Sequence, residues 1–193
     1  MASTCSKKNK QSGFTIIEIV ITLAISVFVF MIIADIFISH NRLFNTQSAL
    51  ADVTINTSLA LNRLQRIIKT ADEVVAARTI NSVNYTTGRE TLILRLPSID
   101  ASQNIIANTF DYAAFHLNPL KPAELVFSLQ ADPASVRRTG DTLISSYVEK
   151  INFNYNSATL SEVNLVSIFL SNARTTFGST LRTPAQTAIS LRN

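Results

Sequence analysis

The chain has 193 residues, of which 47% are hydrophobic and 16% charged, and its formal net charge is +4. Once an N-terminal membrane segment is set aside, this length is enough for one modest domain. Three of the positive charges, Lys7, Lys8 and Lys10, precede Gly13, so the rest of the chain is close to neutral. The composition therefore does not indicate a nucleic-acid-binding protein, which would need lysine and arginine clustered on one face.

A long apolar run follows Gly13 directly. It extends from Phe14 to Ile38, and a helix that spans a bilayer needs about 20 largely apolar residues. A secretory signal is cut after a short apolar core, whereas here the small residue Gly13 precedes the run, so cleavage there would keep the span. An A-x-A pattern at residues 49–51 lies too far beyond the run to act as a secretory cleavage site. The preceding lysines predict a cytoplasmic N-terminus, with the remainder of the chain outside.

Glu18 is an acid near the start of this run. A carboxylate inside a membrane is unfavourable and usually has a partner. Cleavage after Gly13 would free an amino group on Phe14, one helical turn from Glu18, and in a packed array Glu18 could instead neutralise the amine of a neighbouring subunit. The alternative is a carboxylate that reaches the lipid headgroups.

The segment GFTIIEIVITLAI, which begins at Gly13, resembles the class III signal of type IV prepilins and pseudopilins. The resemblance implies cleavage between Gly13 and Phe14 by a prepilin peptidase and N-methylation of Phe14. It also implies a filament built around the retained helices, with Glu18 as the acid used in subunit assembly. The implied partners are other pilins or pseudopilins, a membrane platform protein and a cytoplasmic ATPase that acts indirectly.

No glycine or proline occurs between Gly13 and Gly88, so a continuous helix is allowed. Beyond the membrane run, apolar residues recur at steps of three and four, which predicts a helix with one buried stripe. The stripe consists of Leu50, Val53, Thr57, Leu61, Leu64, Ile68, Ala71 and Val75. We expect a helix from Phe14 to about Val75, roughly 90 Å long, that covers a sheet. Two helices hinged at residues 40–47 are the alternative.

After Arg78 the pattern changes to the alternation of half-buried strands. Four rows show it, at residues 92–96, 125–129, 151–155 and 166–170. Turn signals favour an antiparallel sheet and occur at residues 87–88, 97–98, 118–122, 132–133 and 140–141. The expected fold is α+β and pilin-like. Its expected parts are a cleaved leader at 1–13, a transmembrane helix at 14–39, an amphipathic continuation at 40–78 and an extracytoplasmic β-rich domain at 79–193.

The last part of the chain resembles PilW-type minor pilins and minor pseudopilin J of type II secretion. The resemblance rests on the order of the late strands and on the ending Leu191, Arg192, Asn193. It implies a subunit at or near the filament tip that helps to initiate polymerisation.

Motifs for catalysis or cofactor binding are absent from the sequence. His40 and His116 are the only histidines and lack neighbouring ligands, which argues against a metal site. No serine lies in a G-x-S-x-G elbow, the four glycines do not form a phosphate loop, and no acid begins a calcium loop. The single cysteine, Cys5, falls in the leader. We therefore expect neither enzyme activity nor a cofactor.

The leading hypothesis is a non-enzymatic minor pilin or pseudopilin of a type IV pilus, type II secretion pseudopilus or competence pilus. Such a subunit would stay in the inner membrane until it is extracted into a filament outside the cytoplasm. A second hypothesis is an unprocessed single-span protein whose outer domain binds a ligand or catalyses a reaction. A third is a tip adhesin or DNA-uptake subunit that binds through Arg137 and Arg138, a pair that would otherwise belong to a solvated loop.

Overall fold

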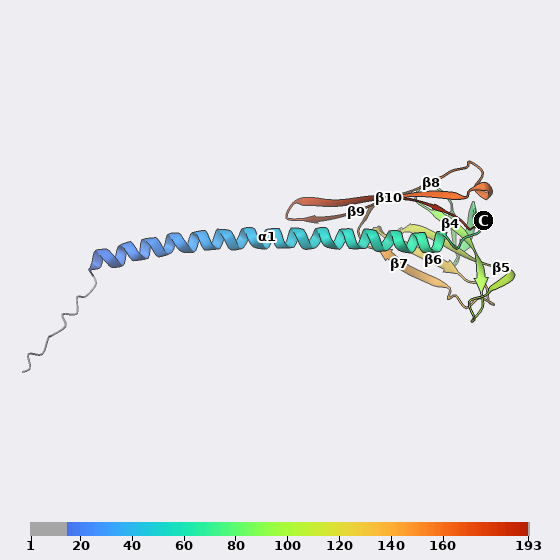
Figure 1. Ribbon diagram of the computed structural model, residues 1–193, viewed down its shortest axis with the longest axis horizontal. Coiled ribbons are helices and arrows are strands. Elements are labelled where there is room, and N and C mark those ends of the chain that lie inside the picture. Colours follow the sequence, from blue (N-terminus) through green and yellow to red (C-terminus); the bar gives the residue numbers. More distant parts are fainter. Residues whose placement is uncertain (1–14, 193) are drawn as a thin grey trace, which may run out of the picture. The chain divides into compact units, whose positions relative to one another are not determined.

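The computed structural model describes residues 15–192 (Figure 1). A single long helix, α1 (Ile16–Ile68), precedes the strands, and every strand pairing is antiparallel. This order confirms the expected α+β, pilin-like fold. The chain divides into two compact units, Met1–Phe44 and Asn45–Asn193, with the boundary inside α1.

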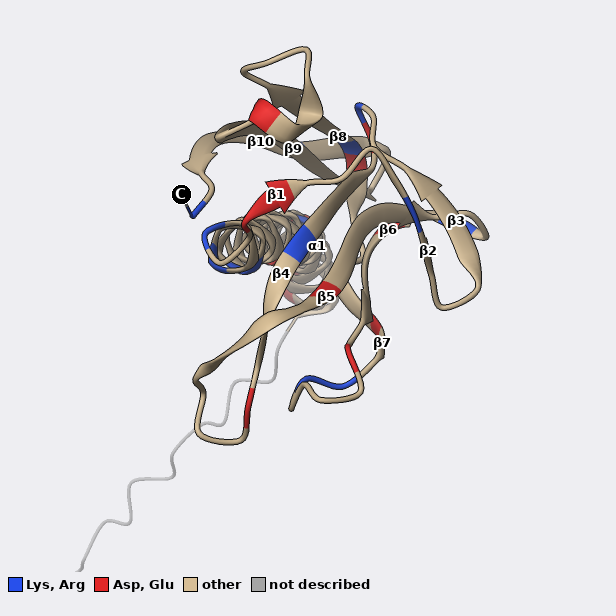
Figure 2. Cartoon of the chain, turned by 90° about the vertical axis from the view of Figure 1, so that its right-hand side faces the viewer, with Lys and Arg blue, Asp and Glu red and all other residues tan. Residues whose placement is uncertain are grey.

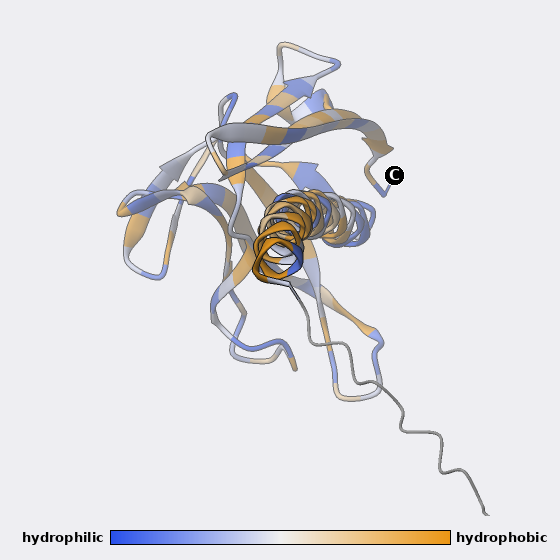
Figure 3. Cartoon of the chain, turned by 90° about the vertical axis from the view of Figure 1, so that its left-hand side faces the viewer, coloured by the Kyte–Doolittle hydropathy of each residue, from blue (hydrophilic) through white to orange (hydrophobic). Residues whose placement is uncertain are grey.

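The first unit contains the apolar part of α1. Every side chain from Thr15 to Phe44 is exposed, and Figure 3 shows this part of the helix in the colours of hydrophobic residues. The helix is long and apolar enough to cross a membrane. No helical break occurs at residues 40–47, so the alternative of two separate helices is wrong at the level of secondary structure.

In the second unit, α1 buries one stripe of side chains. The stripe consists of Ala49, Val53, Thr57, Ala60, Leu64 and Ile68, at steps of three and four. The predicted stripe is therefore largely confirmed, but Leu50 is 45% exposed and Leu61 is only half-buried. Ala49 and Ala60 occupy the buried positions beside them. Periodicity identifies the face of a helix, but it does not decide which of two adjacent residues meets the sheet.

The helix ends earlier than predicted. It stops at Ile68 instead of continuing to about Val75, so the expected helical segment 40–78 is too long. The backbone N–H groups of Thr70 and Ala71 each donate to the carbonyl three residues back, which tightens the last turn. Glu73–Val74 then forms β1, a short strand paired with β4. Competition from strand pairing ended a helix that contains no glycine or proline.

The strands form two sheets and a separate hairpin. The larger sheet has the order β1-β4-β5-β6-β7, with β4 (Leu92–Ile99), β5 (Ile105–Asn118), β6 (Lys121–Gln130) and β7 (Gly140–Ser145). The smaller sheet has the order β10-β9-β8, with β8 (Val148–Tyr155), β9 (Leu165–Thr176) and β10 (Ser179–Ser190). The hairpin consists of β2 (Ala77–Ile80) and β3 (Val83–Thr86), and a short 3-10 helix, η1 (Leu160–Glu162), precedes β9. The four predicted alternating rows lie within β4, β6, β8 and β9, as expected.

Two predicted turns are instead parts of strands. Residues 97–98 belong to β4, and Gly140 and Asp141 begin β7. The pairing register between β4 and β5 shifts between Pro97 and Ile99. A proline lacks the N–H group that a strand ladder needs, and it is tolerated at such an irregularity.

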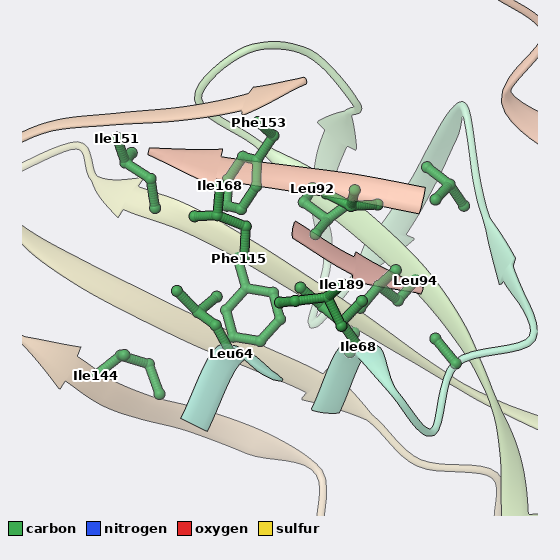
Figure 4. Close-up of a cluster of buried hydrophobic side chains, with 14 of the residues drawn as sticks. Leu64, Ile68, Leu92, Leu94, Phe115, Ile144, Ile151, Phe153, Ile168 and Ile189 are labelled. Atoms are coloured by element: carbon green, nitrogen blue, oxygen red, sulfur yellow. The ribbon is translucent and has the colours of Figure 1, made fainter. Parts of the chain in front are cut away.

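The second part of α1 lies between the two sheets, which share one apolar core around it. Figure 4 shows Leu64 and Ile68 of α1 beside Phe115 of β5, together with Ile168 of β9 and Ile189 of β10. These five side chains are almost completely buried. Burial of each large apolar side chain contributes about 1.5–3 kcal/mol. The core therefore holds the helix and both sheets together as one folded unit.

Candidate functional site

The predicted site is at the beginning of the apolar helix. Gly13 and Phe14 lie outside the described residues, so the structure gives no geometry for the predicted cleavage and methylation positions. Glu18 is described and occupies the first turn of α1. The site can therefore be built from Thr15 onward.

Thr15 and Glu18 form a reciprocal cap at the start of α1. The backbone N–H and the hydroxyl of Thr15 donate to Oε2 of Glu18, both at 3.1 Å. The backbone N–H of Glu18 donates in return to Oγ1 of Thr15 at 3.3 Å. The first N–H groups of a helix have no intrahelical partners, and a cap of this kind satisfies two of them. The carboxylate also lies at the positive end of the helix dipole, where a negative charge is favoured.

This cap is a residue role that the sequence analysis missed. The motif T-x-x-E directly before an apolar run is a recognised start signal for a helix and was present in the sequence. It means that Glu18 has a partner within its own chain. The backbone N–H and the hydroxyl of Thr15 both donate to Oε2, and Oε1 accepts no hydrogen bond from residues 15–192.

Polar side chains continue on the same face of the helix after Glu18. The hydroxyl of Thr22 donates to the backbone carbonyl of Glu18, and the hydroxyl of Ser26 donates to that of Thr22 at 2.7 Å. Residues four apart lie one above another on a helix, so the three side chains form a line. Bonding to the helix's own carbonyls satisfies the hydroxyl donors without water.

Arg137, one of the two arginines predicted to bind DNA, makes its contacts within the outer unit. Nη1 of Arg137 lies 2.6 Å from Oδ2 of Asp111, a fully buried carboxylate, and donates to the carbonyl of Pro97 at 2.7 Å. Arg138 is exposed. In the view of Figure 2, basic and acidic residues of the outer unit are interspersed along the ribbon. Arg137 therefore anchors a loop, which does not favour the DNA-binding hypothesis.

His116 is a largely buried histidine with a complete set of local partners. Its Nε2 lies 3.0 Å from the hydroxyl of Ser128 and 3.2 Å from that of Tyr85, and its Nδ1 lies 3.0 Å from the carbonyl of Leu117. Nδ1 donates to the carbonyl, and Nε2 shares hydrogen bonds with the two hydroxyls. No group of three potential metal ligands occurs among residues 15–192. The surroundings of His116 are those of a structural residue.

Comparison with known proteins gives a match only at the N-terminus. Residues 8–34 match the family model of the prokaryotic N-terminal methylation motif. No curated protein and no solved structure matches the chain. The match, together with a long apolar helix that continues into antiparallel sheets, indicates a type IV pilin-like protein. The resemblance to PilW-type minor pilins and to pseudopilin J stays a prediction.

Proposed function

We propose that this chain is a minor pilin or pseudopilin, a non-enzymatic subunit of a type IV pilus-like filament. The observation that carries the proposal is the methylation motif at residues 8–34, which from Ile16 onward lies in a helix whose side chains are all exposed as far as Phe44. An apolar surface of this extent is unfavourable in water. Lipid covers it before assembly, and the helices of neighbouring subunits cover it afterwards.

Processing precedes assembly in this proposal. A prepilin peptidase cleaves between Gly13 and Phe14, and the new amino group of Phe14 is methylated. The product spans the inner membrane once, with its N-terminus in the cytoplasm and the unit from Asn45 onward outside. A cytoplasmic ATPase and a platform protein then drive its extraction into a filament together with other pilins.

Glu18 has two separable roles in this account. Through Oε2 it completes the cap with Thr15, and this role needs only a hydrogen-bond acceptor. Through Oε1 it can pair with the charged amine at Phe14 of a neighbouring subunit. The second role needs the negative charge, and the attraction is stronger between packed helices than in water.

Two substitutions of Glu18 distinguish these roles. Glu18→Gln keeps a cap because glutamine also serves at this position of a capping box, but it removes the charge. Glu18→Leu removes both the cap and the charge. We expect both variants to insert in the membrane, and both to reduce the number of filaments counted by electron microscopy. Assembly at the wild-type level by Glu18→Gln would contradict the charge role.

Thr15→Ala is the matched control. It removes the hydroxyl from the cap and leaves the charge of Glu18 in place. Because a lost helix cap costs about 1 kcal/mol, we expect a smaller loss of filaments than with either Glu18 variant. A loss equal to that of Glu18→Leu would mean that helix capping, and not charge pairing, explains the need for Glu18.

The position at the filament tip is supported only by the resemblance of the late strands to minor pilins. It predicts few copies of the subunit in each filament. Immunogold labelling of an epitope added after Asn193 should mark one end of each filament. Labels spaced along the whole length would contradict a tip position and indicate a major subunit.

A further inference from the structure

The hairpin of β9 and β10 extends beyond the sheet to which it belongs. Its two strands pair along their whole length, from Thr176 and Ser179 at the turn to Leu165 and Ser190. The third strand, β8, pairs with β9 no further toward the turn than Asn172. Figure 1 shows the free part of the hairpin running alongside α1. The distal part is thus a two-stranded arm. Residues 175–181 form its end, the hairpin tip.

The turn at the hairpin tip has an unusual residue at its first position. Phe177 and Gly178 both have positive φ, at 46° and 78°. A two-residue turn with positive φ at both positions favours asparagine or glycine, and a bulky residue there is strained. The β2–β3 hairpin forms the same kind of turn with Asn81 and Ser82, at 50° and 67°. The chain therefore places an aromatic residue where its other hairpin has an asparagine.

Packing inside the outer unit does not explain this phenylalanine. The side chain of Phe177 is 63% exposed, so the core gains little from it. Backbone strain combined with an exposed aromatic ring points to a contact outside the folded unit.

The chemistry of the hairpin tip suits a lipid surface. Residues 175–181 contain no charged side chain and four hydroxyl side chains. The flanking cations are both paired, Arg174 with Asp52 and Arg182 with Glu149. A phenyl ring surrounded by hydroxyl groups matches the boundary between headgroups and acyl chains, where aromatic residues of membrane proteins are enriched. A binding surface for an acidic or basic protein would instead present an unpaired charge.

The hairpin tip lies at the end of the outer unit that is joined to the apolar helix. Gln65 bonds to Thr187 at 2.9 Å, and the hydroxyls of Thr54 and Thr183 lie 3.4 Å apart, so the arm runs back along α1 toward its start. The turn is five positions beyond Thr183, or about 16 Å at the rise of a strand. That distance corresponds to roughly ten helical residues before Thr54, which brings the tip to the beginning of the outer unit, near Asn45. Asn45 follows the end of the apolar run by only a few residues.

We propose that Phe177 and the hairpin tip contact the outer surface of the membrane while the subunit is still anchored in it. The ring inserts between lipid headgroups, and the surrounding hydroxyls bond to them. This contact holds the outer unit near the bilayer until the subunit is extracted. The inference rests on the membrane anchoring in the proposed function.

The absence of tryptophan from the sequence makes a direct test possible. Phe177→Trp in the full chain introduces a single indole at the hairpin tip. The matched control is Ala101→Trp, in the exposed turn between β4 and β5. Arg95 of β4 pairs with Glu73, which lies just after the end of α1. The turn follows Arg95 in the chain, so it lies at the end of the outer unit that is far from Asn45. Each variant is reconstituted into vesicles of phosphatidylethanolamine and phosphatidylglycerol that carry brominated acyl chains.

We expect the indole of Phe177→Trp to emit at shorter wavelength and to lose roughly half of its fluorescence to the brominated lipid, because interfacial aromatic side chains sit at headgroup depth. The indole of Ala101→Trp should show neither effect. Equal, water-like emission from both variants would overturn the proposal. Shielding that develops only in assembled filaments would also overturn it, because a neighbouring subunit would then be the partner.

Flotation of the same vesicles separates this inference from the proposed function. If the protein floats with the vesicles but the indole of Phe177→Trp is not quenched, the lipid contact is wrong and the anchoring stands. If the protein does not float, the membrane anchoring itself is wrong and the inference falls with it.

Discussion

The two parts of α1 have the same backbone geometry but opposite surroundings. In the first part, Ile16 is 83% exposed and Phe30 is 70% exposed, whereas Val53 and Leu64 in the second part are completely buried. The first part is largely apolar apart from the line of Glu18, Thr22 and Ser26, and the second has one apolar stripe that meets two sheets. One helix can therefore depend on its own domain at one end and on lipid or other subunits at the other.

The largest expected effect is the difference in unfolding free energy between two leucine substitutions, one in each part of α1. Leu64→Ala leaves a cavity between α1 and both sheets, and we expect the outer unit to lose about 2–5 kcal/mol of unfolding free energy. Leu23→Ala, in the exposed part of the helix, should leave that value unchanged. Chemical denaturation of the full chain in detergent micelles measures both. Equal destabilisation would break the comparison, because the two parts would then share one folded unit.

A second effect concerns the loop anchored by Arg137. Arg137→Ala leaves the buried carboxylate of Asp111 without its cation, although Ser98 and Ser135 still donate to it. We expect a loss of about 2 kcal/mol in the unfolding free energy of the outer unit. The exposed neighbour provides the control, since Arg138→Ala should change it by less than about 0.5 kcal/mol. If both variants behave alike, the ion pair does not anchor the loop.

The turn at Phe177 should respond in the opposite direction. Phe177→Asn places a residue that tolerates positive φ where the backbone requires it, so the outer unit should gain up to about 1 kcal/mol in detergent. The change sharpens the comparison because the proposed role of Phe177 is contact with lipid, and not packing within the outer unit. Thermal unfolding of the wild type and the variant measures the difference. A destabilised variant would show that Phe177 serves the fold itself.

The smallest effect depends on pH. The backbone N–H groups of Asn104 and Ser102 donate to Asp100, and these bonds, led by that of Asn104, hold the pKa of its carboxyl below the usual 3.8. Because this pKa is lowered by folding, the stabilisation is present above about pH 3.8 and is lost as the pH falls through the folded value. The stability difference between the wild type and Asp100→Ala should therefore narrow in acid. A constant difference would rule out this titration.

Periodic patterns were enough to predict the main elements. Local sequence predicts the apolar run, the buried face of α1 and four of the strands, because buried residues recur with the period of the helix or strand. The cap formed by Thr15 and Glu18 could also have been predicted from its T-x-x-E spacing.

Features that depend on distant residues could not be predicted in the same way. The end of α1 depends on β1, whose Glu73 pairs with Arg95 at 2.6 Å across two strands. The anchoring of Arg137 by Asp111 joins residues 26 positions apart in the sequence. Neither partner carries a local pattern that identifies the other. Local sequence also does not show that Ala49 is buried in place of Leu50, because this depends on how the sheets pack against α1.

The mass of the N-terminal peptide from membrane-extracted protein tests the central claim most directly. Cells that contain a prepilin peptidase should yield a chain that begins at a methylated Phe14, with the apolar helix retained. A chain that still carries the residues before Gly13 in such cells would contradict the account, and would favour an unprocessed membrane anchor with a binding or catalytic outer domain.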